Sequence, residues 1–167
     1  QFESDIRIAE QLDKIYFESG GGGNGYESYT AAWYFALNNT NLDCHKRGRK
    51  GLIITMGDEP LNPYLPQKPL ERVLGTSLEN NIETSELYNK TIEKFDIYHL
   101  AVIDPKSHGG YYENEIMRSF GVYLDKEHLR KTNLNNITPT IINIITDFAG
   151  EKTHTEQKSG LRKFISW

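Results

Sequence analysis

The sequence has almost no cysteine: Cys44 is the single thiol among 167 residues. An intramolecular disulfide needs two thiols, so this chain cannot be stabilised by one. Long hydrophobic runs are also missing, and no stretch approaches the ~20 apolar residues that a membrane-spanning helix needs. The single cysteine fits a reducing compartment, and together with the missing membrane span it leads us to expect a cytoplasmic location.

The sequence also lacks a strong excess of charge of either sign. Its formal net charge is −4 and its pI is near 5.8, which gives no electrostatic reason to expect nucleic acid or a membrane as a partner. Hydrophobic residues make up 37% of the chain, which is enough for a core and excludes a disordered composition. The length suits one domain, so we expect residues 1–167 to form a single domain.

Several motifs of catalysis are missing as well. The chain has no Gly-Lys-Ser or Gly-Lys-Thr of a triphosphate-binding loop and no Gly-x-Ser-x-Gly nucleophile elbow. It has no His/Cys cluster with the spacing of a metal site. No nucleophile and general base can be named together, so these absences favour a binding protein over an enzyme.

The patterns that are present predict an α/β fold. Apolar runs at residues 51–56 and 95–103 have the length and composition of strands buried on both faces. Weaker patterns predict short strands at residues 12–17 and 121–124. Helical spacing predicts helices at residues 26–37, 70–74, 85–94, 113–120 and 135–148. Strands that alternate with helices predict a three-layer, doubly wound (Rossmann-like) domain with a mostly parallel sheet.

Two stretches could form a site at one edge of that sheet. The glycines of residues 20–25 directly precede a predicted helix, whose free N–H groups could face an anion. Asp58 directly follows a predicted buried strand, which is where open α/β sheets bind ligands, and its oxygens suit a hard cation. The alternatives are equally simple. The glycines could form a tight loop with positive φ angles, and Asp58 could bond the backbone of its own loop.

Three quoted stretches together resemble a bacterial branch of the von Willebrand factor type A family: "GGGGNGYESYTAAWYFALNNT", "KGLIITMGDEPLN" and "ERVLG". In that family a Gly-rich loop opens a helix, and a later buried strand ends in an Asp-containing turn. "FDIYHLAVI" resembles the next strand and "ITPTIINIITDFAG" the last helix, so the resemblance spans nearly the whole chain. It implies a doubly wound domain that holds Mg²⁺ at the top of its sheet.

The resemblance also implies a set of metal ligands. Asp58 matches the family's Asp after a later strand, while Asn24 and Ser28 lie where the family has a Thr. The family's Asp-x-Ser-x-Ser element is absent, and the chain begins at Gln1 rather than Met. We therefore expect a type A domain that lacks its N-terminal first strand. Mg²⁺ demands a nearly complete octahedron of oxygens, so its affinity for this chain is expected to be weak.

The function that the resemblance implies is a protein-interaction module. Its partner, an ATPase or a signalling enzyme, would place a carboxylate on the cation at a rim formed by the Gly loop, residues 57–62 and residues 107–112. Tyrosines are apt rim residues because they combine apolar area with a polar tip, and the candidates are Tyr26, Tyr64, Tyr111 and Tyr112. The alternative is a small α/β enzyme, such as a Mg²⁺-dependent phosphoester hydrolase, that uses Asp58.

Overall fold

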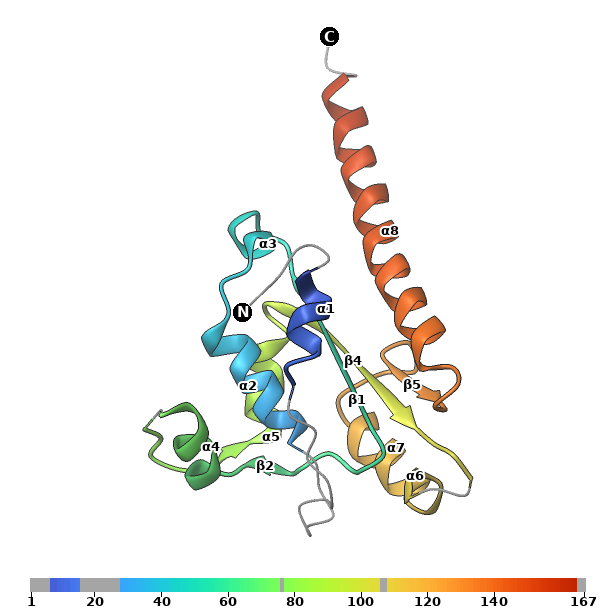
Figure 1. The fold of residues 1–167 in the computed structure, drawn as a ribbon. Helices are drawn as coiled ribbons and strands as arrows, with labels where there is room; N and C mark the ends of the chain where they lie inside the picture. The colour runs from blue at the N-terminus through green and yellow to red at the C-terminus, as the bar shows by residue number, and fades with distance from the viewer. Residues whose placement is uncertain (1–6, 16–27, 76, 106–107, 165–167) are drawn as a thin grey trace.

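The main sheet of the protein has three parallel strands. The computed structural model describes residues 7–15, 28–75, 77–105 and 108–164, and from residue 151 onward it describes the backbone alone. The strands are β1 (Gly51–Gly57), β4 (Phe95–Val102) and β5 (Leu129–Thr132), in the order β1-β4-β5 (Figure 1). A small antiparallel sheet pairs β2 (Tyr64–Leu65) with β3 (Ile82–Glu83). The predicted α/β class with a parallel sheet is confirmed, and it is compatible with a Rossmann-like fold.

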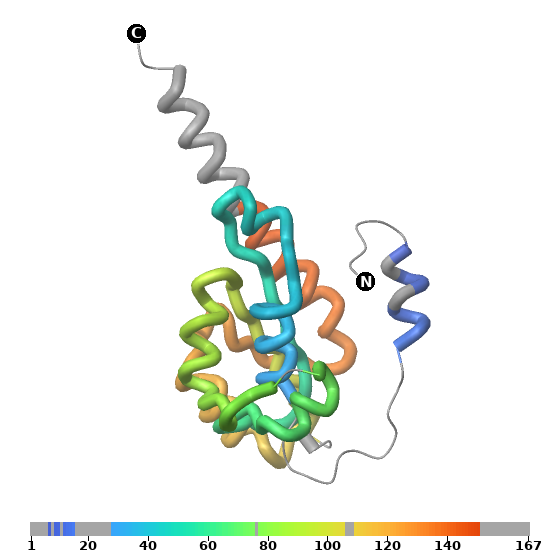
Figure 2. Tube along the Cα trace, turned by 90° about the vertical axis from the view of Figure 1, so that its left-hand side faces the viewer, coloured from blue at the N-terminus to red at the C-terminus, as the bar shows by residue number. Residues whose placement is uncertain are grey.

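Helices flank this sheet. Figure 2 shows α5 and α7 on one side of the strands and the described part of α8 on the other. The helices of the described residues are α1 (Arg7–Leu12), α2 (Tyr29–Asn39), α3 (Asp43–Lys46), α4 (Gln67–Leu74), α5 (Thr84–Thr91), α6 (His108–Tyr111), α7 (Glu113–Gly121) and α8 (Ile137–Phe164). None of them combines the length and the hydropathy that a membrane span requires.

The central strand β4 sends alternate side chains into the main core. Phe95, Ile97, His99 and Ala101 lie on one face of the strand, and all four are buried. This face packs against α2, α5 and α7, which contribute the fully buried side chains of Trp33, Leu87, Ile116 and Phe120. The periodicity of two along β4 therefore places the core between the sheet and these three helices.

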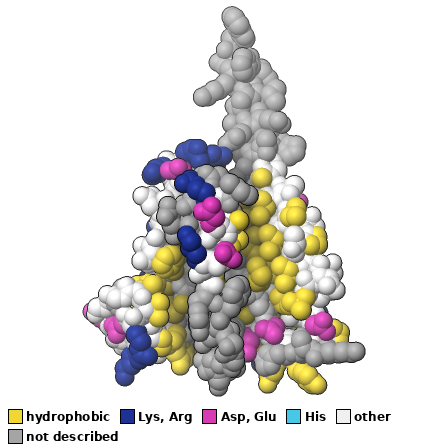
Figure 3. Space-filling view, in the orientation of Figure 1, with side chains coloured by type: hydrophobic (Ala, Val, Ile, Leu, Met, Phe, Trp, Pro, Cys, Tyr) yellow, Lys and Arg dark blue, Asp and Glu magenta, His cyan; other side chains and the backbone are white. Residues whose placement is uncertain are grey.

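The opposite face of the sheet is covered less completely. Leu100 of β4 and Ile144 of α8 are both fully buried. Met56 of β1, however, is 44% exposed, and Ile142 and Ile145 of α8 are about half exposed. Figure 3 shows hydrophobic side chains gathered in this part of the surface.

Both weakly predicted strands are wrong. Leu12 ends α1, Asp13 and Lys14 form a turn, and the rest of the predicted segment at residues 12–17 is either irregular or outside the described residues. At residues 121–124, Gly121 ends α7, and the next residues form a turn that continues it. The N–H groups of Tyr123 and Leu124 both donate to the Phe120 carbonyl oxygen at 2.9 Å. The β-favouring Val and Tyr are overridden by the helix before them.

The predicted helices exist, but several ends differ. Gly75 closes α4 with a φ of 64°, as predicted, because glycine adopts this left-handed conformation at little cost. Thr84 was expected to cap α5, yet Glu83 holds that position and Thr84 is the first helical residue. The last helix was expected to end at Gly150, but α8 continues to Phe164. Pro139 lies in the first turn of α8, as predicted.

Candidate functional site

The start of α2 is fixed against the carboxyl end of β1. Tyr29 is 6% exposed, and its ring packs edge-on against His99 and Phe120, with ring centroids 5.0 and 5.4 Å apart. Its hydroxyl reaches Gly57: a Cβ added to that glycine would lie 1.9 Å from the hydroxyl oxygen. Residue 57 must therefore be glycine, because the Tyr29 side chain occupies the space that a Cβ atom at residue 57 would need.

Asp58, the next residue, lies against the start of α6. A Cβ added to Gly109 would be 2.9 Å from the Asp58 Cβ and 2.3 Å from the Val102 carbonyl oxygen. The helix α6 and the end of β4 thus meet beside Asp58. The predicted loop at residues 107–112 is therefore wrong for His108–Tyr111, which form this short helix, and Ser107 lies outside the described residues.

The loop that follows Asp58 is held at two points by helices of the core. The Leu61 N–H donates to the Ser119 hydroxyl of α7 at 2.9 Å, and that hydroxyl donates to the Ile116 carbonyl oxygen at 3.0 Å. Further along, the Thr84 hydroxyl of α5 donates to the Asn62 carbonyl oxygen at 2.6 Å. These bonds order the loop before any ligand arrives, which lowers the entropy cost of binding.

Removal of the Ser119 hydroxyl tests this attachment. We expect Ser119→Ala to lower the free energy of unfolding by about 1–2 kcal/mol, because the half-buried Leu61 N–H loses its acceptor. Urea unfolding measures the change. Ser85→Ala on α5, at an exposed serine, is the matched control and should change stability by less than about 0.5 kcal/mol. Equal effects of the two substitutions would show that Ser119 does not hold the loop.

Two of the three predicted metal ligands lie next to residues that contact each other. Ser28 immediately precedes Tyr29, whose hydroxyl touches Gly57, and Asp58 comes directly after that glycine. The Ser28 side chain is exposed and makes no capping hydrogen bond to α2. Asn24, the third predicted ligand, lies outside the described residues. These segments thus provide the Asp58 carboxylate and the Ser28 hydroxyl as candidate oxygen ligands, and Glu59 follows Asp58 in the same loop.

A hard cation at this edge would have few protein ligands. Within the described ranges, no group of three or more His, Cys, Asp or Glu side chains is placed to hold a metal ion. Asp58 and Ser28 would supply two of the six oxygens that Mg²⁺ requires, and water or a partner would supply the others. Oxygen ligands of this kind suit Mg²⁺ or Mn²⁺ better than Zn²⁺.

Exposed tyrosines lie in the segments that follow β1 and β4 along the chain. Tyr111 is 86% exposed, Tyr64 is 43% exposed and Tyr112 is 40% exposed. The fourth predicted rim tyrosine, Tyr26, lies outside the described residues. From here on, "the rim" means Ser28, residues 57–62, Tyr64 and residues 109–112. Large exposed aromatic side chains are enriched at protein interfaces, so their presence on the rim favours a macromolecular partner.

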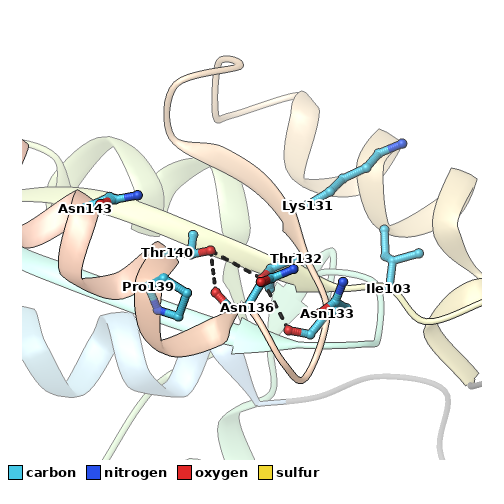
Figure 4. Close-up of a pocket in the computed structure, with 8 residues that line it drawn as sticks. All are labelled: Ile103, Lys131, Thr132, Asn133, Asn136, Pro139, Thr140 and Asn143. Atoms are coloured by element: carbon cyan, nitrogen blue, oxygen red, sulfur yellow. Dashed lines mark hydrogen bonds between the residues drawn. The ribbon is translucent and has the colours of Figure 1, made fainter.

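A polar pocket at the ends of β4 and β5 was missed by sequence reasoning. It has a volume of about 510 Å³ and lies where Ile103, Thr132 and Asn133 leave the sheet and α8 begins (Figure 4). The hydroxyl groups of Thr132 and Thr140 form a hydrogen bond of 3.3 Å, and the Thr140 hydroxyl donates to the Asn136 carbonyl oxygen at 2.7 Å. The pocket could not be predicted because β5 itself was not predicted.

A buried histidine beneath the rim was also missed. His99 is fully buried, its ring stacks on Phe120 with centroids 3.6 Å apart, and its Nδ1 lies 3.0 Å from the Thr55 hydroxyl oxygen. Its Nε2 has no hydrogen-bond partner within the described ranges. Burial lowers the pKa of His99 to about 3, so the ring is neutral at neutral pH. The alternation of β4 was the available signal, since it places His99 on the face of Phe95 and Ile97.

The fold and the rim define a mixed α/β domain with a candidate binding edge at the carboxyl ends of parallel strands. A scan of the chain against protein-family models found no match, and searches of curated proteins and of solved structures found none.

Proposed function

We propose that this chain is a protein-interaction module of the von Willebrand factor type A kind, which binds its partner at the rim with the help of a divalent cation. The observation that carries the proposal is the meeting of three elements beside Asp58. Tyr29 at the start of α2 touches Gly57, and Gly109 at the start of α6 lies against Asp58. Open α/β sheets bind ligands at this edge.

Each part of the rim has a role in this proposal. Asp58, Ser28 and Asn24 hold Mg²⁺ weakly, and the carboxylate of an Asp or Glu on the partner completes its shell. The tyrosines of the rim, Tyr64, Tyr111 and Tyr112, supply apolar contact area around that central charge. The loop after Asp58 is already held by Ser119 and Thr84, so little ordering accompanies binding. An ATPase or a signalling enzyme is the partner class we propose.

Calorimetric titration of the full chain with Mg²⁺ and Mn²⁺ tests the cation site. We expect saturable binding by the wild-type chain and at least about a tenfold loss of affinity in Asp58→Ala, because the site loses the carboxylate that is proposed to bind the cation. Asp43→Ala is the matched control. Asp43 belongs to α3, before β1 begins, and its side chain is 80% exposed and paired with Lys46. Unchanged binding in Asp58→Ala would remove the cation from the proposal.

A panel of phosphoester substrates separates this proposal from the enzymatic alternative. The interaction module is expected to show no turnover with Mg²⁺ present. Turnover that Asp58→Ala abolishes and Asp43→Ala retains would assign Asp58 to a hydrolase instead.

A further inference from the structure

One edge of β1 has no neighbouring strand among the residues that the structure describes. The main sheet has the order β1-β4-β5, so β1 pairs with β4 alone in it. The Gly51 N–H donates to the Lys94 carbonyl oxygen at 2.8 Å, which fixes the alternation along the strand. The odd-numbered residues of β1 therefore bond β4. The backbone N–H and C=O groups of Leu52, Ile54 and Met56 point the other way, to what we call the open edge.

The composition of β1 is unusual for an outer strand. Its seven residues include no charge and no proline, and Leu52, Ile53 and Ile54 follow one another. Outer strands are normally protected against further pairing by short length, by lysine or by proline. The other outer strand, β5, has this protection, because it has four residues and two of them are Arg130 and Lys131. The contrast indicates that β5 is protected against a further strand and that β1 is not.

The sequence of β1 suits pairing with a second copy of itself. A two-fold axis makes the two strands antiparallel, and an axis at Ile54 sets this residue opposite Ile54 of the second copy. Leu52 then lies opposite Met56 of the second copy. Every residue whose backbone points to the open edge meets one that does the same, which allows about six hydrogen bonds. Their side chains share one face of the strand, where Met56 is 44% exposed, so apolar side chains meet across the axis.

The charges that flank β1 favour the same arrangement. Arg49 and Lys50 precede the strand, and Asp58 and Glu59 follow it. In the antiparallel pair, the basic start of each strand lies beside the acidic end of the other. Lys50 contacts Asp96 of its own chain at 3.5 Å, and its side chain is 46% exposed, so it can also approach the second copy. A parallel pair would place like charges side by side, which is destabilising.

We propose that two copies of this chain pair along the open edge and form one continuous sheet, with the antiparallel β1 strands at its centre. The strand order of the dimer is β5-β4-β1-β1-β4-β5. The short, charged β5 strands become its two outer edges, and the apolar strands all lie inside it. This inference goes beyond the proposed function and does not rest on it, since the pairing needs neither a cation nor another protein.

Sedimentation equilibrium of the full chain over a range of concentrations tests the proposal, with a chelator present to exclude Mg²⁺. We expect the wild type to show a monomer–dimer equilibrium. Met56→Lys should raise its dissociation constant at least about tenfold, because a charge would lie opposite Leu52 of the second copy. Val122→Lys is the matched control. Val122 is 72% exposed and follows α7 rather than belonging to the sheet, so this change should be less than about twofold.

Cysteine cross-linking tests the register. In a Cys44→Ser background, which removes the native thiol, Ile54→Cys should form an intermolecular disulfide on oxidation. Residues that face each other in an antiparallel pair have Cα atoms about 5.5 Å apart, which a disulfide can bridge. Met56→Cys is the matched control, because the two copies of this residue would be roughly 13 Å apart along the strands and should not cross-link.

The remaining outcomes separate the dimer from the proposed function. A wild-type chain that stays monomeric up to about 100 µM would overturn the dimer and leave the cation site to its own titration. A dimer that Met56→Lys leaves intact would use another surface, and equal cross-linking of Ile54→Cys and Met56→Cys would exclude this register. Either result would overturn the proposal. A dimer that responds to the variants as expected and binds no Mg²⁺ would support the pairing and count against the proposed function.

Discussion

Gly57→Ala is expected to lower the free energy of unfolding by about 2–3 kcal/mol, which corresponds to a fall in Tm of roughly 5–10 °C for a chain of this size. The new methyl carbon would lie 1.9 Å from the Tyr29 hydroxyl oxygen and 2.9 Å from the Cζ of that ring. The ring cannot move aside easily, because it is buried and packs edge-on against both His99 and Phe120. Thermal and urea unfolding of the variant measure both quantities.

Two further variants show whether the Tyr29 hydroxyl causes this effect. Gly121→Ala, at a glycine with open space around it, should change stability by less than about 0.5 kcal/mol. Combining Gly57→Ala with Tyr29→Phe removes the closest atom, so the double variant should be at least about 1 kcal/mol more stable than the sum of the single effects. Full additivity would show that another contact sets the cost of the new methyl group.

The same contact links stability to the proposed function. If α2 shifts to accommodate the methyl group, Ser28 shifts relative to Asp58, because Ser28 immediately precedes Tyr29. The Gly57→Ala variant should therefore lose Mg²⁺ affinity even though it keeps every predicted ligand. A loss of Mg²⁺ affinity in this variant would show that binding depends on where the ligands are placed and not only on which ligand residues are present.

The long apolar patterns of the sequence predicted the centre of the fold. β1 and β4 are mostly apolar runs of strand length, which is the composition typical of strands in a parallel sheet, even though Met56 of β1 is exposed on the less covered face. The stripe of Tyr29, Trp33 and Leu37 predicted α2 for the same reason, since its buried face repeats every three to four residues. Where burial determines the structure, apolar residues recur in the sequence at the spacing of the helix or strand, and the element can be predicted.

The short and polar elements could not be read in this way. β5 contains Arg130 and Lys131 between Leu129 and Thr132, so it has neither an apolar run nor a clear alternation. It forms because the edge of β4 offers hydrogen bonds in register, as in the bond from the His99 N–H to the His128 carbonyl oxygen at 2.9 Å. This is a tertiary contact that no local pattern encodes. The pocket at the end of β5 was missed as a result.

The candidate site was only partly readable. Asp58 was expected after a buried strand, and it does follow β1, whereas the helix pattern predicted a start at residue 26 and α2 begins at Tyr29. The sequence did not indicate that Tyr29 would meet Gly57, that Gly109 would lie against Asp58, or that Ser119 would hold the intervening loop. Each of these contacts joins residues far apart in the chain, and a single sequence without a repeating pattern does not specify them.

Acid is expected to destabilise the protein through His99. The folded-state pKa of this residue is about 3, against an ordinary value of 6.5. As the pH falls below 6.5, the unfolded chain binds a proton at this histidine and the folded chain does not. The free energy of unfolding should therefore fall by about 1.4 kcal/mol for each pH unit until the pH nears 3, and the stability is fully present above pH 6.5. Urea unfolding at a series of pH values measures this slope.

The surroundings of His99 explain why the folded state resists the proton. Its ring is packed against Phe120 of α7 and Tyr29 of α2, and its neighbour on β1 is the Thr55 hydroxyl. No carboxylate among the described residues bonds the ring to offset the cost of burying a charge. In the wild-type protein, the NMR resonances of the His99 imidazole should not shift between about pH 7 and pH 4.5, because the ring stays neutral over that range. This measurement requires no variant.

Two histidine variants isolate the slope. His99→Gln removes the buried imidazole, so its free energy of unfolding should depend on pH less steeply than that of the wild type by about 1.4 kcal/mol per unit. His128→Gln removes a partly exposed imidazole whose Nδ1 is 2.7 Å from the Asp125 carboxylate, and that pairing lowers the pKa of Asp125. This control should retain the steep wild-type slope between pH 6.5 and pH 4.5, because it leaves His99 in place. If His99→Gln and the wild type instead lose stability in parallel as the pH falls, other groups cause the acid sensitivity, and His99 takes up its proton in the folded protein as readily as in the unfolded one.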